Sequence, residues 1–165
     1  MPPEAIFDVT TVDLSRVLAD REAIRAVNPQ RFELEQLDAI VLIEPAQNLI
    51  VGYKDVRPDE FWVRGHFPNG PLLPGMLMCE AAAQLCSYFA IVQGVMAPGT
   101  MLGFGGLEEV RFRGPVRPGD RLVLVSKATR LNRRQSRFNV QGFVSGQMVF
   151  HADVIGIALA MPPGA

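Results

Sequence analysis

The longest apolar segment of the chain covers residues 76–92 and contains neither proline nor glycine. Its apolar residues fall on every face of a helix, which is typical of a helix buried inside a protein rather than laid on its surface. Gly94 is well placed to end such a helix. We therefore predict a buried helix over residues 76–93. Its single charged residue, Glu80, needs an explanation, because an unpaired buried charge is costly.

Strand-like segments flank this helix on both sides. Before it, residues 39–43 and 48–55 predict a hairpin, because the turn-forming residues 44–47 separate them. After it come four further segments whose turn signals predict consecutive antiparallel hairpins. These four lie at residues 101–112, 121–131, 136–144 and 147–159. The order of elements predicts an α+β fold, in which a curved antiparallel sheet wraps around one buried helix.

The N-terminal part of the chain shows a helical pattern. An apolar stripe predicts a first amphipathic helix over residues 12–27, and a short helical segment follows at residues 31–37. A brief extended segment is expected at residues 61–63. At 165 residues the chain is expected to form one domain. We divide it into an N-terminal extension, residues 1–27, and a core, residues 28–160.

The composition is that of an ordinary globular protein, with 48% hydrophobic and 20% charged residues. No uninterrupted apolar run approaches the roughly 18–20 residues that a membrane span needs. The first residues carry acids rather than a charged and then apolar leader. We therefore expect a cytoplasmic protein with no membrane partner.

The two cysteines are interpreted as small hydrophobic residues of the core. Cys79 and Cys86 are seven residues apart on the predicted helix, or about 10 Å along its axis, which is too far for a disulfide. Two cysteines with no nearby histidine do not make a zinc site either. We expect buried thiols, and neither a metal nor a cofactor.

The formal net charge of −1 hides an uneven distribution. Residues 111–137 contain nine basic residues and one acid, net +8, whereas residues 1–110 contain seven basic and fifteen acidic residues, net −8. A basic segment suggests an anionic partner. Nucleic acid is not expected, because aromatic residues are sparse there and no nucleic-acid motif is present. A small acidic protein and a phosphorylated ligand both fit, and so does a simple solvated strand surface.

The residues just before and inside the central helix can support acid–base chemistry. His66 lies in an irregular turn, and imidazole is the side chain best matched to proton transfer near neutral pH. Glu80 supplies a carboxyl group one turn into the helix. Gly75 opens the helix, where free N–H groups can hold a developing oxyanion. Gln84 falls on the face of Glu80 and could orient it or a substrate. These groups suit β-elimination of a hydroxyl next to a carbonyl, although a structural role for each residue explains the spacing equally well.

Two motifs in the chain resemble those of bacterial 3-hydroxyacyl-acyl carrier protein dehydratases. Residues 66–84 read HFPNGPLLPGMLMCEAAAQ, which is similar to the family signature HFPxxPxxPGxLxxEAxAQ. Residues 104–120 read FGGLEEVRFRGPVRPGD and resemble the segment FAGIDxxRFxxPVxPGD. The two motifs have the family's order, and the similarity extends over residues 28–159.

The resemblance implies a hotdog fold and a homodimer, or three such dimers assembled together. Each active site would take His66 from one subunit and Glu80 from the other. The family reaction removes water from a 3-hydroxyacyl thioester to give the trans-2-enoyl thioester. By this resemblance His66 takes the C2 proton, Glu80 protonates the leaving hydroxyl, and the Gly75 amide polarises the thioester carbonyl. The same motif implies that Gln84 and Phe67 bind substrate.

The resemblance also implies a branch of the family and a partner. A glutamate at position 80, rather than an aspartate, resembles the branch that dehydrates but does not isomerise the double bond. The basic segment would bind the acidic acyl carrier protein that holds the 3-hydroxyacyl chain. The residues expected to dock it are Arg111, Arg113, Arg133 and Arg134.

Three departures from the family pattern leave chain-length preference and gating open. The family's N-terminal PHRxPFLLVDR is reduced to PQRFELEQLD at residues 29–38. Gly103 replaces a gate tyrosine that is found in many members. The first predicted helix extends the chain beyond the usual short start of the family. Two other functions stay open from sequence alone. One is a hotdog thioesterase, and the other is a non-catalytic module that binds an acyl chain or its carrier.

Overall fold

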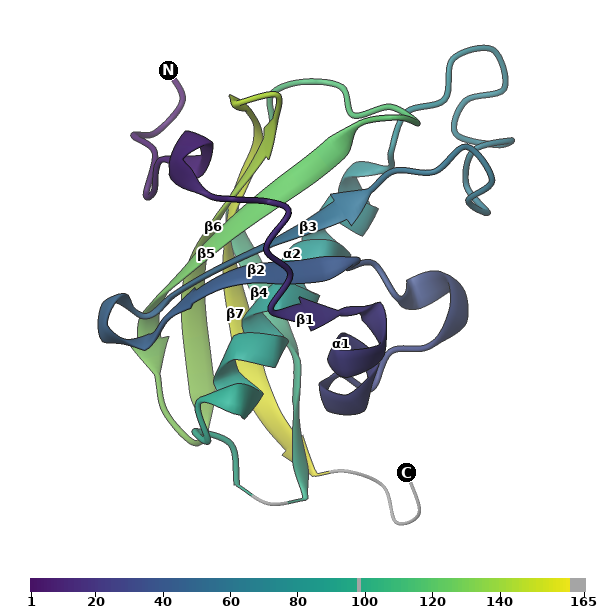
Figure 1. Cartoon of the computed structure of the whole chain (residues 1–165). Coiled ribbons are helices and arrows are strands. Elements are labelled where there is room, and N and C mark those ends of the chain that lie inside the picture. The colour runs from purple at the N-terminus through teal and green to yellow at the C-terminus, as the bar shows by residue number, and fades with distance from the viewer. Residues whose placement is uncertain (98, 161–165) are drawn as a thin grey trace.

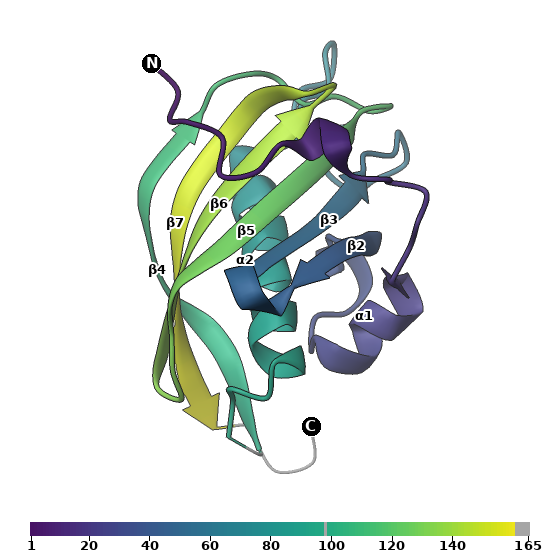
Figure 2. The same ribbon diagram turned by 60° about the vertical axis from the view of Figure 1, so that its left-hand side comes forward.

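The protein is a hotdog fold, in which a curved seven-stranded antiparallel sheet wraps around one long helix, α2 (Gly75–Val92). A computed structural model describes residues 1–97 and 99–160 of the chain. Figures 1 and 2 show α2 lying against the inner face of the sheet, as the sequence predicts. The strands are β1 (Ala19–Asp20), β2 (Ala39–Glu44), β3 (Leu49–Asp55), β4 (Thr100–Phe112), β5 (Arg121–Leu131), β6 (Gln135–Val144) and β7 (Gln147–Ala160).

Helix α2 is the centre of the hydrophobic core. Its own residues Leu85 and Phe89 are fully buried, and the Phe89 ring packs edge-on against Phe138 of β6 with the ring centroids 6.2 Å apart. Gly94, which follows the helix, has φ +66°, a left-handed conformation that favours glycine and ends helices. By length and composition α2 could cross a membrane, but 61% of its residues are buried inside the fold. Enclosure by the sheet explains its apolar composition.

The order of the strands differs from the predicted series of hairpins. The four segments after α2 are strands, and β5, β6 and β7 follow one another in the sheet as predicted. Strand β4, however, pairs with β7 at the outer edge, and β5 pairs with β3. The connection from β4 to β5 passes the ends of β7 and β6, which lie between these two strands in the sheet. Two hydrogen bonds hold this connection: Leu73 N–H donates to Val116 O over 2.8 Å, and Val56 N–H donates to Asp120 O over 2.9 Å. Such long-range anchoring leaves no trace in local turn signals.

The predicted helix over residues 12–27 is wrong in its first half. The helix α1 covers only Arg21–Val27, and a 3-10 turn lies at Val9–Thr11. Between them the Asp13 carboxylate accepts hydrogen bonds from the backbone N–H and the hydroxyl of Ser15, which closes a local turn in place of a helix. The Asp20 carboxylate then caps α1 by accepting from Ala23 N–H over 2.9 Å.

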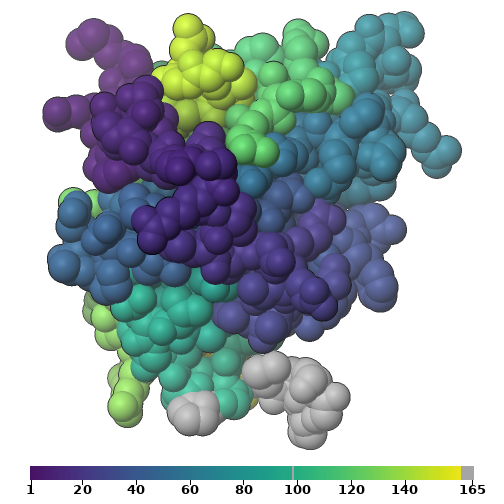
Figure 3. All heavy atoms as spheres, in the orientation of Figure 1, coloured from purple at the N-terminus to yellow at the C-terminus, as the bar shows by residue number. Residues whose placement is uncertain are grey.

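The segment before α1 forms an N-terminal strap, residues 4–18, on the outer face of the sheet. Figure 3 shows it, in the darkest purple, across the front of the molecule. The side chain of Gln141 on β6, 1% exposed, holds the strap by accepting from Ile6 N–H and donating to Glu4 O. The apolar side chains of the strap that pack against the outer face are Ile6, Phe7, Val9, Val12 and Leu14. Both faces of the sheet therefore carry a hydrophobic layer.

Two further predictions of local structure need correction. In residues 31–37 only a 3-10 turn at Phe32–Leu34 is helical, and residues 61–63 form turns rather than an extended segment. The hairpin of β2 and β3 is confirmed, with a 3-10 turn at Pro45–Gln47 between the strands.

The thiols are free and buried, as predicted. Burial raises the pKa of Cys79 to about 11 and that of Cys86 to about 12, the latter lying 3.2 Å from the Ser126 hydroxyl.

Candidate active site

His66 is held by backbone hydrogen bonds in the irregular loop between β3 and α2. Its N–H donates to Trp62 O over 2.8 Å, and its carbonyl accepts from Leu72 N–H over 2.8 Å. The ring atom Nδ1 lies 2.8 Å from Leu72 O. Because a carbonyl oxygen only accepts, Nδ1 must carry the hydrogen of this bond, which leaves Nε2 with a free lone pair in the neutral ring. The ring stacks on Phe67 with the centroids 4.2 Å apart, and the His66–Phe67 peptide bond is cis.

His66 and the beginning of α2 line the same hollow of about 450 Å³. Gly75 is the first residue of the helix, and a Cβ there would lie 2.6 Å from Cζ of Phe112, so the ring of Phe112 occupies the place of a side chain. Leu77 and Met78 donate their N–H groups to Pro74 O. Within the described residues, the N–H of Gly75 has no hydrogen-bond partner, and this end of a helix attracts negative charge.

Glu80 is half-buried on α2 and is oriented by Gln84. The Gln84 Nε2 donates to Glu80 Oε1 over 2.8 Å, as the spacing of four residues predicts. Gln84 itself is 2% exposed and is fixed by the segment before β2, because its Oε1 accepts from Gln36 N–H over 2.9 Å and its Nε2 also donates to Leu34 O. The orientation of the amide is determined by these partners, since a backbone N–H can only donate.

Glu80 lines a second hollow, of about 230 Å³, whose walls are mostly apolar. Gly103 on β4 lies in its wall, and a Cβ at Gly103 would collide with the side chain of Leu159 on β7, which covers this position. A larger hollow of about 690 Å³ adjoins it, because Pro29 and Met101 line both. Glu80 thus lines a mostly apolar hollow beside a larger one, which reaches Ile91 near the far end of α2 and is also lined by Arg25 and Arg31.

One chain does not bring His66 and Glu80 together. The two side chains line different hollows, and no hydrogen bond joins them within the described residues. His66 is grouped with Gly75 and Phe112, whereas Glu80 is grouped with Gln84 and the inner surface of β4.

The four arginines predicted to dock a carrier fall into two separate groups. Arg111 lies opposite His151 of β7, and Arg113 donates to His151 Nδ1 over 3.1 Å. Arg133 and Arg134 lie in the turn between β5 and β6, where Arg134 O accepts from Ala158 N–H. His151 and Ala158 are seven residues apart on one strand, about 23 Å at 3.3 Å per residue. The basic segment is therefore not a continuous stripe on one chain.

Other basic residues of that segment are paired with acids. Arg121 binds Asp55 through two hydrogen bonds, and Arg137 binds Asp153 and Glu108. The uneven charge along the sequence is thus partly neutralised in the folded chain, although Arg111, Arg113, Arg133 and Arg134 stay exposed.

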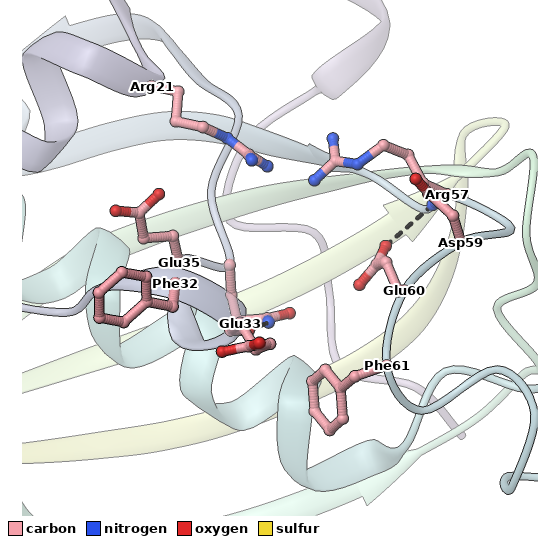
Figure 4. Close-up of a pocket in the computed structure, with 9 residues that line it drawn as sticks. Arg21, Phe32, Glu33, Glu35, Arg57, Asp59, Glu60 and Phe61 are labelled. Atoms are coloured by element: carbon pink, nitrogen blue, oxygen red, sulfur yellow. Dashed lines mark hydrogen bonds between the residues drawn. The ribbon is translucent and has the colours of Figure 1, made fainter.

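A further hollow of about 360 Å³ lies between α1 and the loop after β3, and Figure 4 shows its charged lining. Its arginines, Arg21 and Arg57, both donate to Oδ1 of Asp38, over 2.7 and 2.8 Å. Its carboxylate Glu60 is paired with Lys54. The described residues contain no cluster of three or more metal-ligating side chains. Because these charged side chains are already paired with one another, we interpret the hollow as a structural feature rather than the reaction site.

The sequence reasoning missed Phe112, Lys54 and Glu60. A lysine inside the otherwise apolar strand β3, LIVGYKD, was an available signal, because a buried lysine requires a partner. The packing of Phe112 on Gly75 had no such signal, because the two residues are far apart in sequence.

Comparison with known proteins identifies the family of the chain. The FabA-like domain family matches residues 28–153. The 3-hydroxyacyl-[acyl-carrier-protein] dehydratase FabZ of Acinetobacter baylyi is 35% identical over 82% of this chain and 92% of that protein. The protein of the same name from Desulfotalea psychrophila is 36% identical over 77% of this chain and 85% of its own length.

Solved structures share the fold. The dehydratase heterocomplex ApeI:P from Xenorhabdus doucetiae aligns with a TM-score of 0.64 at 15% identity, over 86% of this chain and 91% of that one. A hypothetical thioesterase from Streptococcus pneumoniae aligns with a TM-score of 0.61 at 12% identity, over 85% and 97%. At such low identities these structures define the class of hotdog proteins. The sequence relatives go further: this chain belongs to the FabA-like family and, within it, to the FabZ 3-hydroxyacyl-[acyl-carrier-protein] dehydratases.

Proposed function

We propose that the protein removes water from 3-hydroxyacyl chains carried on acyl carrier protein and gives trans-2-enoyl thioesters for fatty acid synthesis. The main support for this proposal is the hydrogen bonding of the His66 ring. Its Nδ1–H is tied to Leu72 O, so that Nε2 is free to act as a base in the hollow that it shares with Gly75. The substrate named for the sequence relatives supports the same reaction.

The reaction divides between three groups. His66 Nε2 takes a proton from C2 of the thioester, and the electrons of that C–H bond form the C2–C3 double bond. The Gly75 N–H stabilises the negative charge that develops on the thioester oxygen. Glu80, in its protonated form, gives its proton to the C3 hydroxyl, which leaves as water, so Glu80 ends as a carboxylate and His66 as an imidazolium. Phe67, stacked on the His66 ring, would contact the substrate near the base.

We further propose that the active site forms between two copies of the chain, with His66 of one facing Glu80 of the partner subunit. The separate hollows of the two residues support this arrangement. Strand β4 supports it too, because within residues 1–97 and 99–160 it pairs with β7 on one side and with no strand on the other. Exposed apolar side chains, which a second copy would cover, gather around the His66 loop and β4: Phe61, Phe67, Met76, Phe104 and Phe112.

The two groups of arginines both border this shared site. Arg113 lines the hollow of His66. Arg134 bonds to Ala158, which lies opposite Leu102 in the wall of the Glu80 hollow. We propose that Arg111, Arg113, Arg133 and Arg134 attract the acidic carrier from both subunits. Assembly of three dimers and a cytoplasmic location stay predictions.

One assay separates this function from its alternatives. The purified protein is given 3-hydroxybutyryl or crotonyl thioester, and enoyl absorbance and free thiol are followed separately. We expect interconversion of the hydroxyacyl and enoyl thioesters, with losses of about 10²–10⁴-fold in His66→Ala and Glu80→Gln. Glu22→Gln, an exposed carboxylate on α1, is the matched control and should keep wild-type rates.

The other outcomes of this assay contradict the proposal. Release of thiol would indicate a thioesterase, and silence toward both readouts would indicate a binding module. Wild-type turnover by a folded His66→Ala or Glu80→Gln variant would disprove the assigned roles.

A further inference from the structure

An ion pair of a buried lysine with a largely buried glutamate lies at the beginning of the loop that carries His66. Lys54, near the end of β3, has a side chain 1% exposed, and its Nζ lies 2.8 Å from Oε2 of Glu60, whose side chain is 9% exposed. Removing two charges from water costs as much as their attraction returns, so a buried ion pair is weak evidence for a stabilising role. We therefore looked for a role of the Lys54–Glu60 pair in the residues that it contacts.

Glu60 is the centre of a small network. Its Oε1 accepts from Arg57 N–H over 2.8 Å, the dashed line in Figure 4. Its Oε2 accepts from the indole Nε1–H of Trp62 over 3.0 Å, in addition to the Lys54 ammonium. Burial raises the pKa of Glu60, but the hydrogen bonds from Lys54, Arg57 and Trp62 outweigh burial and bring it below its usual value. The carboxyl is therefore a carboxylate with three donors at neutral pH.

The network ends at the backbone of His66. Trp62 is 5% exposed and packs in the hydrophobic core. Its carbonyl accepts from His66 N–H over 2.8 Å and from Gly65 N–H over 3.1 Å. The path from the sheet to His66 therefore runs from Lys54 through Glu60 and the two ends of Trp62, its indole and its carbonyl. On the far side of His66, the chain returns to the sheet region through the bond between Leu73 N–H and Val116 O.

We propose that the Lys54–Glu60 pair is a positioning device for His66, which fixes Trp62 and, through its carbonyl, the base of the reaction. This inference rests on the proposed function only in calling His66 the base. Lys54 and Glu60 touch no reacting atom, so they are positioning residues. A misplacement of about 1 Å in a reacting group can cost on the order of 10²-fold in rate, which is the scale of effect expected here.

The test removes the charges together and reads His66 directly. Glu60→Gln alone would leave a buried unpaired lysine, so Lys54→Met with Glu60→Gln is made as a double variant of similar volume, which such pairs tolerate in other proteins. Trp62→Phe is the second variant, because it deletes the indole donor while it keeps an aromatic ring in the core. Asp55→Asn is the control, since the half-exposed ion pair of Asp55 with Arg121 is next to Lys54 in sequence but makes no hydrogen bond to the His66 loop within the described residues.

Each variant is measured by kcat and KM on the small thioester, by thermal unfolding, and by nitrogen-15 NMR of the histidine rings. The chain has two histidines, so His66→Ala assigns their signals. We expect cooperative unfolding, a KM close to wild type and a kcat reduced about 10- to 100-fold in the double variant and in Trp62→Phe. The His66 signal should move from the Nδ1–H form toward the mixture of a free imidazole, while Asp55→Asn should match wild type.

Two results would overturn the inference. One is wild-type kcat with an unchanged His66 signal in the folded double variant and in Trp62→Phe. The other is a lowered melting temperature with an unchanged His66 signal, which would indicate a purely structural pair. An active His66→Ala variant would disprove the proposed function instead, and the NMR signal would still report whether the pair positions the ring.

Discussion

At the scale of single residues, the site depends on which atoms are already engaged in hydrogen bonds. Leu72 O engages Nδ1 of His66 and so leaves Nε2 free. Gln84 engages Oε1 of Glu80 and so leaves Oε2 available to a substrate hydroxyl. In both cases a neighbour that only accepts or only donates determines the proton position of the reactive group.

Gln84→Ala should therefore lower both activity and stability. It deletes the donor to Glu80 and to Leu34 O, and it leaves the buried Gln36 N–H without its partner, which costs about 1–3 kcal/mol for that buried group. We expect kcat to fall about tenfold or more, measured with the small thioester, and the unfolding free energy to fall in a urea titration. Gln93→Ala, at the partly buried residue that follows α2, is the matched control. Unchanged kcat in Gln84→Ala would contradict an orienting role.

At the scale of elements, the local sequence pattern predicted where most strands and the central helix lie, but not which strands pair with each other. The contact of Glu80 with Gln84 and the single buried helix follow from helical spacing, which the sequence contains directly. The position of β4 at the sheet edge depends on anchors between residues far apart, such as Leu73 with Val116. Val12 and Leu14 contributed to the apparent helical stripe, but the strap uses them on the outer face of the sheet, whereas Val17 and Leu18 are exposed. The sequence therefore paired Glu80 with Gln84 correctly but did not predict the separate hollows of His66 and Glu80, and the roles of these residues stay predictions.

The junction of α2 with β4 gives a prediction at this scale. Gly75→Ala places a methyl group where Phe112 now packs, 2.6 Å from Cζ. Phe112 is 48% exposed, so we expect its ring to move into the hollow beside His66 and lower kcat/KM about tenfold or more, with a small effect on melting temperature. Steady-state kinetics of Gly75→Ala and of Gly75→Ala with Phe112→Leu check this, because the smaller side chain should restore part of the loss. No recovery in the double variant would assign the defect to the helix end rather than to the ring.

At the scale of the whole molecule, the sheet has an outer face covered by the N-terminal strap and a long edge strand, β4, at the end opposite the two-residue strand β1. The N-terminal strap covers the apolar outer face of the sheet, and Gln141 holds it there. In the described part of the chain, no segment covers the edge of β4 or the exposed rings of Phe67, Phe104 and Phe112 in this way. A partner that completes the sheet at β4 would bury these rings and join the two hollows, whereas association through the outer face would first have to displace the strap.

A site shared between two copies can be tested by mixing two inactive variants. In a mixed dimer of His66→Ala and Glu80→Gln chains, one site receives His66 from the second chain and Glu80 from the first, and the other site receives neither. Random exchange makes about half of the dimers mixed, so activity should recover to about one quarter of the wild-type rate. Native mass spectrometry of chains with different tags confirms the exchange before the assay. The control mixture pairs His66→Ala with the His66→Ala, Glu80→Gln double variant, which offers no complete site and should stay inactive. Confirmed exchange without recovery would mean that each chain builds its site alone, and that the separation of His66 from Glu80 is closed by a movement within one subunit.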